Sequence, residues 1–240
     1  MSSRKSTFLV TGASKGIGRA VSANLAAKGH IVVGIARTSG AEEFPGTFFS
    51  CDLGNLQQTE DSLDRIAARL DIDGIVNNVG ISLPQPLGKI DFQTFQSVMD
   101  LNVRAAVQVT QKLVEGMKVK KWGRIVNVCS RAIFGARDRT AYAAAKSALV
   151  GCTRTWALEL AEFGITSNAV APGPVETELF RQSRPVGSEA EHRLLSTIPM
   201  RRVGQPDEVA AAICFFLSSE ASFITGAVLA IDGGGSLGGR

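Results

Sequence analysis

The segment TFLVTGASKGIG, residues 7–18, decides the fold that the sequence predicts. Residues 7–10 form a short apolar and β-branched run typical of a buried strand, and a glycine-rich turn follows at once. Residues 17–28 then have the apolar spacing of a helix, and Gly29 is well suited to end it. A strand, a glycine turn and a helix in this order form the first unit of a parallel α/β sheet.

The same alternation continues along the chain. Further strands are predicted at residues 31–36, 47–51, 74–77, 124–129, 165–170 and 228–231. Helices are predicted at residues 56–70, at 91–117 behind an N-cap at Asp91, at 140–163, and from Pro206 onward. We expect residues 1–240 to form a single doubly wound α/β domain, with a seven-stranded parallel sheet and helices on both faces. The irregular stretch near residues 174–202 mixes Pro, Gly, Ser and Arg, as a lid over a site does.

Composition and charge exclude several classes of protein. The chain has 240 residues, 45% of them hydrophobic and 20% charged, which is typical of a globular protein. A net charge of +4 without a long run of like charges disfavours a nucleic-acid surface. Four cysteines without C-x-x-C spacing and two histidines give no metal site and suit free thiols in a reducing compartment. Without a signal peptide or a bilayer-spanning apolar stretch, we expect a soluble cytoplasmic protein with no membrane partner.

The glycine turn predicts a site for a phosphate. Its small residues let the backbone approach a ligand closely, and the N-terminus of the next helix offers free N–H groups to a negative charge. The spacing is neither G-x-G-x-x-G nor that of a P-loop, and a plain tight turn is the alternative interpretation. The position between a strand and a helix favours a dinucleotide, with contacts expected from Gly12, Ser14, Lys15, Gly16, Ile17 and Gly18.

The charge at the end of the second predicted strand distinguishes the two nicotinamide dinucleotides. An acid there binds the ribose 2′-hydroxyl of NAD, whereas a basic residue accommodates the 2′-phosphate of NADP. This chain has Arg37 there and no acid before Glu42, and Lys15 adds a second cation. We therefore expect NADP(H) as the cofactor. Asp52 and Leu53, after the third predicted strand, are expected beside the adenine ring, with a helix cap at Asp52 as an equal alternative.

Four polar residues form the candidate catalytic group. Tyr142, the single tyrosine of the chain, stands four residues before Lys146, so a helix places both on one face. A lysine ammonium beside a phenol stabilises the phenolate, as proton transfer requires, although such pairs also arise on helices by chance. Ser130 ends the fifth predicted strand, at the edge where open α/β sheets bind ligands. Asn102 stands inside a predicted helix, where asparagine is a poor helix former.

Together these motifs resemble the short-chain dehydrogenase/reductase family over essentially the whole chain. The matching residues are Thr11-Gly12 with Gly16-Ile17-Gly18, Asn77-Asn78-Val79-Gly80, Asn102, Ser130, Tyr142 with Lys146, and Pro172-Gly173. The resemblance implies a Rossmann-type fold and hydride transfer between the nicotinamide and a ketone or alcohol. The family commonly forms tetramers, so it also implies a homotetramer built on residues 91–117, 140–163 and the C-terminal segment.

The resemblance also implies a role for each residue of the site. Tyr142 would transfer the proton, and Ser130 would hydrogen-bond the same substrate oxygen. Lys146 would hold the nicotinamide ribose and favour proton loss from the tyrosine, while Asn102 would support a water relay to that lysine. The remaining implied cofactor contacts are Asn78, Gly80, Pro172, Gly173, Val175 and Thr177.

Within the family, the chain is most similar to 3-oxoacyl-[acyl-carrier-protein] reductases. Val79 stands where the family usually has alanine, and the segment from Ser130 to Tyr142 is one residue short. The carrier reductases usually have a basic residue where this chain has Phe163, although Lys121 remains basic. An acyl carrier protein is therefore one candidate partner, and we expect a free ketone or thioester to serve as well as a carrier-bound one.

Other functions fit the same sequence less well. A non-catalytic NADP-binding regulator on this fold would not need Ser130, Tyr142 and Lys146. A nucleotide-dependent methyltransferase is disfavoured by Arg37 and by the tyrosine–lysine pair. The substrate itself is not named by the sequence. Arginines at positions 131, 137 and 139 indicate an acidic substrate, or else are solvated loop charges.

Overall fold

The computed structural model, which describes residues 5–40 and 43–237, contains a parallel sheet of seven strands in the order β3-β2-β1-β4-β5-β6-β7. The strands are β1 (Thr7–Thr11), β2 (Ile31–Ala36), β3 (Thr47–Ser50), β4 (Gly74–Asn77), β5 (Gly123–Val128), β6 (Ile165–Pro172) and β7 (Val228–Ile231). The order reverses between β1 and β4, so a crevice opens there at the carboxyl ends of the strands. The doubly wound seven-stranded sheet predicted from the sequence is confirmed.

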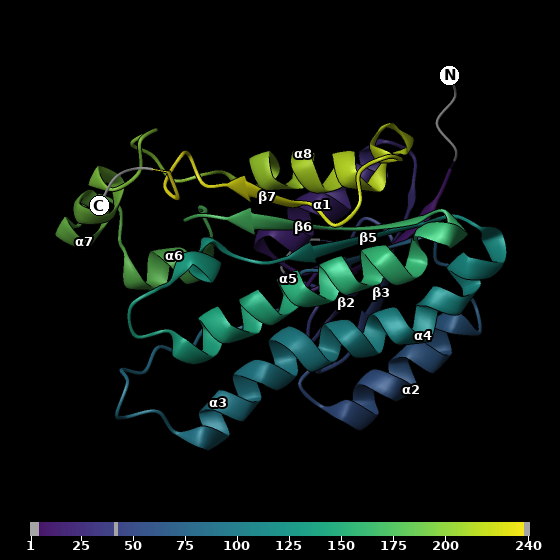
Figure 1. The fold of residues 1–240 in the computed structure, drawn as a ribbon, viewed down its shortest axis with the longest axis horizontal. Coiled ribbons are helices and arrows are strands. Elements are labelled where there is room, and N and C mark those ends of the chain that lie inside the picture. Colours follow the sequence, from purple (N-terminus) through teal and green to yellow (C-terminus); the bar gives the residue numbers. More distant parts are fainter. Residues whose placement is uncertain (1–4, 41–42, 238–240) are drawn as a thin grey trace.

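Helices cover both faces of this sheet (Figure 1). On one face α1 (Gly16–Ala27) packs against α8 (Pro206–Leu217), and on the other lie α2 (Leu56–Ala67), α4 (Ala105–Lys120) and α5 (Thr140–Leu160). Alternate residues of β1 explain the two layers, because Val10 joins the cluster of α1 and α8 while Leu9 joins that of α2 and α4. Strands buried on both faces are the reason for the continuous apolar runs in the sequence.

The helix predicted at residues 91–117 is not a regular α-helix. It begins behind Asp91, whose side chain accepts a hydrogen bond from the Thr94 N–H at 2.7 Å, as the sequence predicted. After α3 (Phe92–Met99) the chain makes a π-helical turn at Asp100–Arg104, and only then continues as α4. The π-turn surrounds Asn102, whose amide bonds to backbone carbonyls rather than pointing to solvent. Single π-turns inside helices often mark functional sites.

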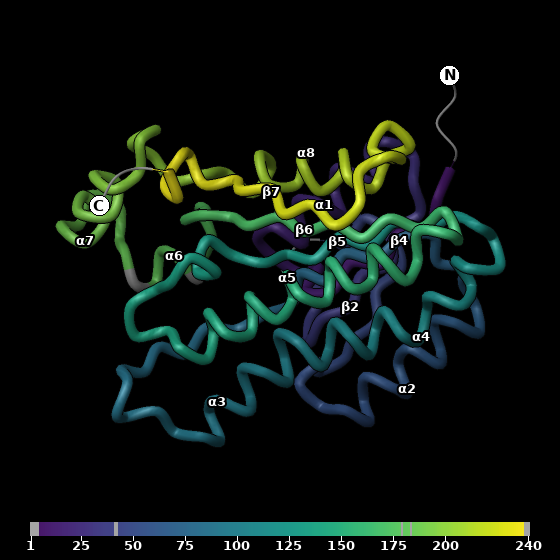
Figure 2. Tube along the Cα trace, in the orientation of Figure 1, coloured from purple at the N-terminus to yellow at the C-terminus, as the bar shows by residue number. Residues whose placement is uncertain are grey.

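The stretch near residues 174–202 is more regular than the sequence indicated. It contains α6 (Glu178–Ser183) and α7 (Glu189–Ser196), and Figure 2 shows it beyond the sheet, beside the tail that follows β7. Arg181 joins the two helices through ion pairs to Glu176 and Glu191. The Met200 N–H also donates to the Gly233 carbonyl at 3.1 Å, which fixes the segment to the tail. Paired charges thus order a segment that has little apolar periodicity.

Two further findings concern the described residues only. None of their helices is long and apolar enough to cross a membrane. They also hold no cluster of three or more histidine, cysteine or acidic side chains that could bind a metal ion. All four cysteines are free thiols.

Candidate active site

Tyr142 and Lys146 lie in the first turns of α5, above the carboxyl end of β5. The Lys146 Nζ atom is 5.7 Å from the centre of the Tyr142 ring, so the two side chains share one helix face as predicted. Only 3% of Lys146 is exposed, and its Nζ donates to the Val128 carbonyl at 2.8 Å. This hydrogen bond ties the buried ammonium to the last residue of β5, so its position is set by the sheet and not by solvent.

Asn102 and Lys146 converge on Gly80. A Cβ atom built on Gly80 would lie 2.5 Å from Asn102 Oδ1 and 3.1 Å from Lys146 Nζ. The Asn102 Nδ2 donates to the Val98 and Ile81 carbonyls at 2.8 and 2.9 Å, whereas its Oδ1 is buried without a partner among the described residues. This oxygen is therefore free to accept a hydrogen bond beside the lysine, the geometry that a water relay to the lysine requires.

Ser130 lies at the end of β5, where the chain turns away from the sheet. Its side chain caps a short 3-10 turn (Arg131–Phe134) by accepting a hydrogen bond from the Ala132 N–H at 3.2 Å. The preceding residue, Cys129, is 3% exposed, and burial raises the pKa of its thiol to about 11, with Lys146 acting in the opposite direction. This thiol stays neutral near pH 7, so it adds no negative charge beside the lysine.

The glycine turn after β1 is built for close backbone approach. A Cβ atom on Gly18 would lie 2.3 Å from the Gly12 carbonyl oxygen, and Gly12 itself has φ +63°. Asn78, after β4, supports this turn because its Nδ2 donates to the Thr11 and Gly12 carbonyls at 2.9 and 3.2 Å. Gly16 has φ +54° and faces Thr177 from the far side of the crevice. The cradle fits a dinucleotide diphosphate at the N-terminus of α1.

The residues expected at the adenosine end of the cofactor follow β2 and β3. Arg37 is exposed directly after β2, and its carbonyl accepts from the Ser50 hydroxyl at 2.8 Å. Lys15, in the glycine turn, is also exposed, with its Nζ 3.9 Å from Glu178 of α6. Glu42, the nearest acid after Arg37 in sequence, lies outside the described residues.

Asp52 does not cap a helix, so that alternative is wrong. Its Oδ1 accepts from the Gly54 N–H at 2.9 Å, while Asn55 caps α2 by accepting from the Gln58 N–H at 3.0 Å. Leu53 is 2% exposed and packs into the core next to that turn. The Asp52 turn stands at the carboxyl end of β3, on the edge of the sheet where open α/β folds bind ligands.

The segment expected around the nicotinamide closes the other end of the crevice. Pro172 is the last residue of β6, and a Cβ atom on Gly173 would meet Asp232 at 2.8 Å, directly after β7. Val175 forms a bridge to Gly204, and Thr177 caps α6 by accepting from the Phe180 N–H at 3.2 Å. The structure therefore brings the predicted residues together along one edge of the sheet, from β3 to β6.

Sequence reasoning passed over Thr11 as a residue of the site. Its hydroxyl donates to the Val76 carbonyl at 3.3 Å and accepts from the Asn78 and Val79 N–H groups at 2.9 and 3.0 Å. It thereby joins the end of β1 to the end of β4 at the point where the strand order reverses. The signal available in the sequence was its place in the Thr11-Gly12 motif that carries the family resemblance, although no role in the site was assigned to it there.

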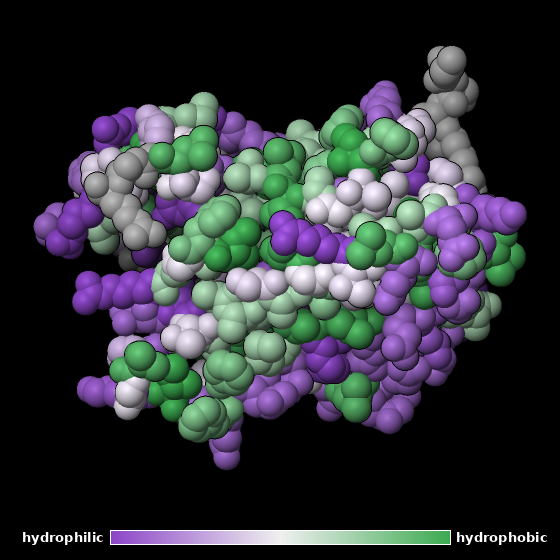
Figure 3. All heavy atoms as spheres, viewed as in Figure 1, coloured by the Kyte–Doolittle hydropathy of each residue, from purple (hydrophilic) through white to green (hydrophobic). Residues whose placement is uncertain are grey.

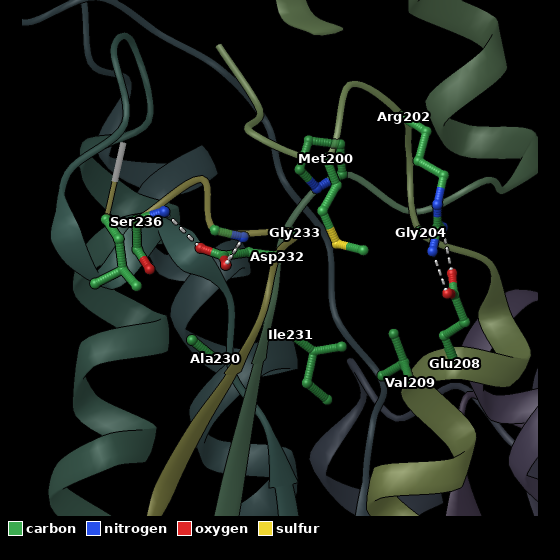
Figure 4. A pocket seen from close by; sticks show the side chains of 13 residues that line it. Met200, Arg202, Gly204, Glu208, Val209, Ala230, Ile231, Asp232, Gly233 and Ser236 are labelled. Atoms are coloured by element: carbon green, nitrogen blue, oxygen red, sulfur yellow. Dashed lines mark hydrogen bonds and ion pairs between the residues drawn. The ribbon is translucent and has the colours of Figure 1, made fainter. Parts of the chain in front are cut away.

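A cavity of about 430 Å³ lies behind the tail that follows β7, on the side of α8. Figure 4 shows it between Met200, Val209 and Ile231, with the Arg202–Glu208 ion pair at its edge. None of the four predicted catalytic residues lines it. Two of its lining residues, Gly204 and Asp232, also contact the segment that closes the crevice, so the cavity adjoins that end of the crevice.

Comparison with known proteins agrees with this site. The family model described as Enoyl-(Acyl carrier protein) reductase matches residues 12–236. The 3-oxoacyl-[acyl-carrier-protein] reductase MabA of Mycobacterium avium is 36% identical over 239 residues, with 97% of this chain and 90% of that protein covered.

Two solved structures have the same fold over nearly their whole length. The aldohexose dehydrogenase of Thermoplasma acidophilum has a TM-score of 0.90 at 32% identity, covering 98% of this chain and 95% of the other. A 3-oxoacyl (acyl-carrier-protein) reductase of Agrobacterium tumefaciens C58 with NADP bound has a TM-score of 0.89 at 27% identity, covering 96% and 94%.

The fold, the crevice and these likenesses define the class of protein as an oxidoreductase that uses a nicotinamide dinucleotide. The chain belongs to the short-chain dehydrogenase/reductase family. The reading of the sequence motifs as this family is confirmed.

The contact at Gly80 can be tested directly. Gly80→Ala places a methyl group against Asn102 and Lys146, and we expect turnover to fall roughly a hundredfold because both side chains must move. The control is Gly116→Ala on α4, where a Cβ atom meets nothing within 4 Å and turnover should not change. Steady-state rates and thermal unfolding of both variants give the comparison. Equal rates for Gly80→Ala and the parent would contradict a catalytic role for this convergence.

Proposed function

We propose that this protein is an NADPH-dependent reductase of ketones, with Ser130, Tyr142, Lys146 and Asn102 as its catalytic group. One observation carries the proposal. The buried Lys146 ammonium lies beside the chain's single tyrosine, at the end of β5, and it meets Gly80 together with the Asn102 oxygen, which has no partner among the described residues. An unneutralised buried ammonium costs free energy, and a proton-transfer role explains why this one is kept.

The chemistry follows from that arrangement. The bound nicotinamide supplies a hydride to the carbonyl carbon of the substrate. The Tyr142 hydroxyl donates its proton to the carbonyl oxygen, and the Ser130 hydroxyl donates a hydrogen bond to the same oxygen. The Lys146 ammonium stabilises the phenolate that remains. The Asn102 oxygen accepts a hydrogen bond from the chain of donors through which a proton returns to the phenolate. Carbonyl and reduced cofactor become alcohol and oxidised cofactor.

NADP(H) is proposed over NAD(H) from the charges at the adenosine end. Arg37 follows β2 and Lys15 lies in the glycine turn, and both side chains are exposed where a 2′-phosphate would stand. Solvent-exposed guanidinium and ammonium groups bind phosphate oxygens with charge-assisted hydrogen bonds. The NADP bound in the Agrobacterium reductase supports the same choice.

We expect NADPH to be preferred over NADH by at least about tenfold in kcat/KM, because each charge-assisted phosphate contact is worth about 1.5–3 kcal/mol. Arg37→Asp should remove most of this preference by placing an acid against the phosphate and beside the ribose. Arg69→Asp, an exposed charge reversal away from the crevice, is the matched control. Initial rates with each cofactor measure the effect. Equal use of NADPH and NADH by the unchanged protein would refute the assignment.

A non-catalytic cofactor-binding protein is the second candidate, and Tyr142→Phe separates the two. This change removes one hydroxyl and keeps the ring. Turnover should fall by roughly a hundredfold or more, since general acid catalysis contributes that much. The dissociation constant for NADPH, measured by fluorescence titration, should stay within about twofold because the hydroxyl acts on the substrate. Near-parent turnover in this variant would overturn the mechanism.

The carrier reductases among the relatives suggest a 3-oxoacyl thioester as one substrate. At the position where this chain lacks a docking cation, Phe163 stacks with Lys118, whose Nζ is 5.4 Å from the ring centre. Gly164 stands against Lys121, because a Cβ atom there would lie 2.5 Å from the Lys121 carbonyl oxygen. The candidate docking patch, formed by Lys118, Lys121 and Phe163, keeps two lysines, one of which pairs with Glu115. It lacks the cation that carrier reductases usually have at position 163. We therefore propose that free ketones and thioesters serve as well as carrier-bound ones.

We also propose that the protein is a homotetramer. Small residues (Ala144, Gly151 and Thr155) lie exposed on the outer face of α5, together with Leu158, which is 85% exposed. Figure 3 shows apolar and weakly polar residues gathered across α5 and β7 on this face. Small residues let two helices approach closely, and such an apolar band favours association.

Leu158→Glu should break this assembly, because it buries a charge in the proposed helix contact. Leu56→Glu, at an exposed apolar position on α2, is the matched control. Light scattering at micromolar concentration should give a tetramer for the parent and the control, and a smaller species for Leu158→Glu. A monomeric parent protein would refute the proposal.

A further inference from the structure

Arg131 directly follows Ser130 and crosses the carboxyl end of the sheet. It begins the 3-10 turn after β5, and its Nη1 donates to the Gly235 carbonyl at 3.1 Å in the tail that follows β7. A Cβ atom on Gly235 would lie 2.6 Å from the same Nη1, so the tail is shaped around the guanidinium. The side chain is half-buried. A positive charge is thus carried by the residue that directly follows the serine proposed to bind the substrate carbonyl.

The Arg131 guanidinium donates fewer hydrogen bonds within the fold than two other arginines, Arg124 and Arg104. Arg124 is buried but donates three hydrogen bonds, to the Ser218, Gly123 and Gly164 carbonyls. Arg104 also donates three, to the Leu53 and Gly54 carbonyls and to the Gln108 side chain.

For Arg131 the single hydrogen bond to Gly235 uses one of five donors, and no described acid forms an ion pair with it. Because the side chain is only partly buried, its remaining donors are not used by the fold and stay open to a partner from outside. This asymmetry indicates that the remaining donors serve a ligand.

The surrounding loop adds positive charge. Arg137 and Arg139 lie on the segment between Ser130 and the start of α5, and neither forms an ion pair with a described acid. Asp138 is the single acid of residues 131–140 and is exposed. Its carbonyl accepts from the Gln85 N–H at 2.6 Å, which attaches this loop to the segment before α3. The wall of the proposed substrate site therefore has a net positive charge.

We propose that Arg131 binds a carboxylate of the substrate, so that the preferred substrates are keto acids with the carboxylate a few bonds from the reacting carbonyl. The proposal rests on the ketone reductase function given above and names its substrate class. A guanidinium is a planar fork that matches a carboxylate with two parallel hydrogen bonds. Adjacent Cα atoms lie about 3.8 Å apart, so a short molecule held at the Ser130 hydroxyl lies within the span of the long Arg131 side chain.

The phosphate of an acyl carrier protein's phosphopantetheine arm is not the anion that Arg131 would bind. In an acyl carrier substrate the phosphate stands at the far end of the phosphopantetheine arm, well away from the thioester carbonyl. A cation adjacent to Ser130 is too close to that carbonyl to meet the phosphate. The docking patch around Phe163 also lacks one of its cations. Position thus favours a carboxylate on the substrate itself.

The test compares acids with their neutral esters at the same carbon skeleton. The substrates are pyruvate, acetoacetate and levulinate, each beside its ethyl ester, and the N-acetylcysteamine thioester of acetoacetate. With NADPH at pH 7, the best acid should exceed its ester by about tenfold or more in kcat/KM, as a desolvated charge-assisted pair provides. Arg131→Gln keeps a polar side chain but removes the charge, and the ratio of acid to ester should fall to about one.

Arg137→Gln is the matched control, because it removes an exposed charge from the same loop and should keep the ratio of the parent. Titration calorimetry provides a second measurement that needs no turnover. The hydroxy acids that correspond to the three keto acids are each titrated into the enzyme with oxidised cofactor. At least one should bind, and Arg131→Gln should weaken the tightest binding by about tenfold. Thermal unfolding and NADPH affinity of the variant show whether its fold is intact.

The outcomes separate this inference from the proposed function. If esters and thioesters are reduced as fast as the acids, or if Arg131→Gln keeps the ratio of the parent, the carboxylate assignment is wrong while the reductase remains. If no ketone is reduced at all, the proposed function is wrong. In that case hydroxy acid binding that depends on Arg131 still supports the anion site, and its absence overturns it.

Discussion

The close approach of the backbone at Gly12 and Gly18 is the constraint on which the site depends. A side chain at Gly18 would meet the Gly12 carbonyl at 2.3 Å, so the first turn of α1 can lie against the end of β1 only with glycine there. Asn78 then fills the remaining space and holds the turn through two hydrogen bonds from its amide. Because Asn78 follows β4, the turn is fixed to the strand across the reversal of the sheet. A ligand phosphate therefore meets a preformed backbone surface.

The catalytic half of the site depends on a second anchor, the buried ladder of amides beneath it. Asn77 donates to Asn127 at 2.8 Å across neighbouring strands, and Asn127 donates to the Thr153 hydroxyl of α5 at 2.8 Å. Buried polar groups that satisfy one another rigidify the elements that carry them. This ladder joins β4, β5 and α5 at the level just inside Lys146. Three elements therefore fix the position of Lys146, as its proposed role in proton transfer requires.

Much of this could be predicted from the sequence, because local rules determine it. Helical spacing placed Tyr142 and Lys146 on one face, and the glycine spacing placed the cradle after β1. The π-turn at Asn102 could not be predicted, because it depends on a hydrogen bond from the Asn102 amide to the Ile81 carbonyl, which is distant in sequence. The order in the 174–202 segment was missed for a similar reason. Its ion pairs at Arg181 replace the apolar periodicity by which helices are recognised.

Two sets of cations in the chain differ in whether an acid of the fold pairs with them. Arg181 and Arg202 have carboxylate partners within the fold, and Lys120 pairs with Asp73. These ion pairs hold segments of the chain together. Arg37 and Arg131 form no ion pair with a described acid, and both stand where strands of the sheet end. A charge that the fold does not neutralise, placed at the ligand edge of a sheet, is complementary to an anion from outside. One end of the crevice would thus select the cofactor by its phosphate and the other end the substrate by its carboxylate. The same sheet would hold both anions at a separation fixed by the strands between them.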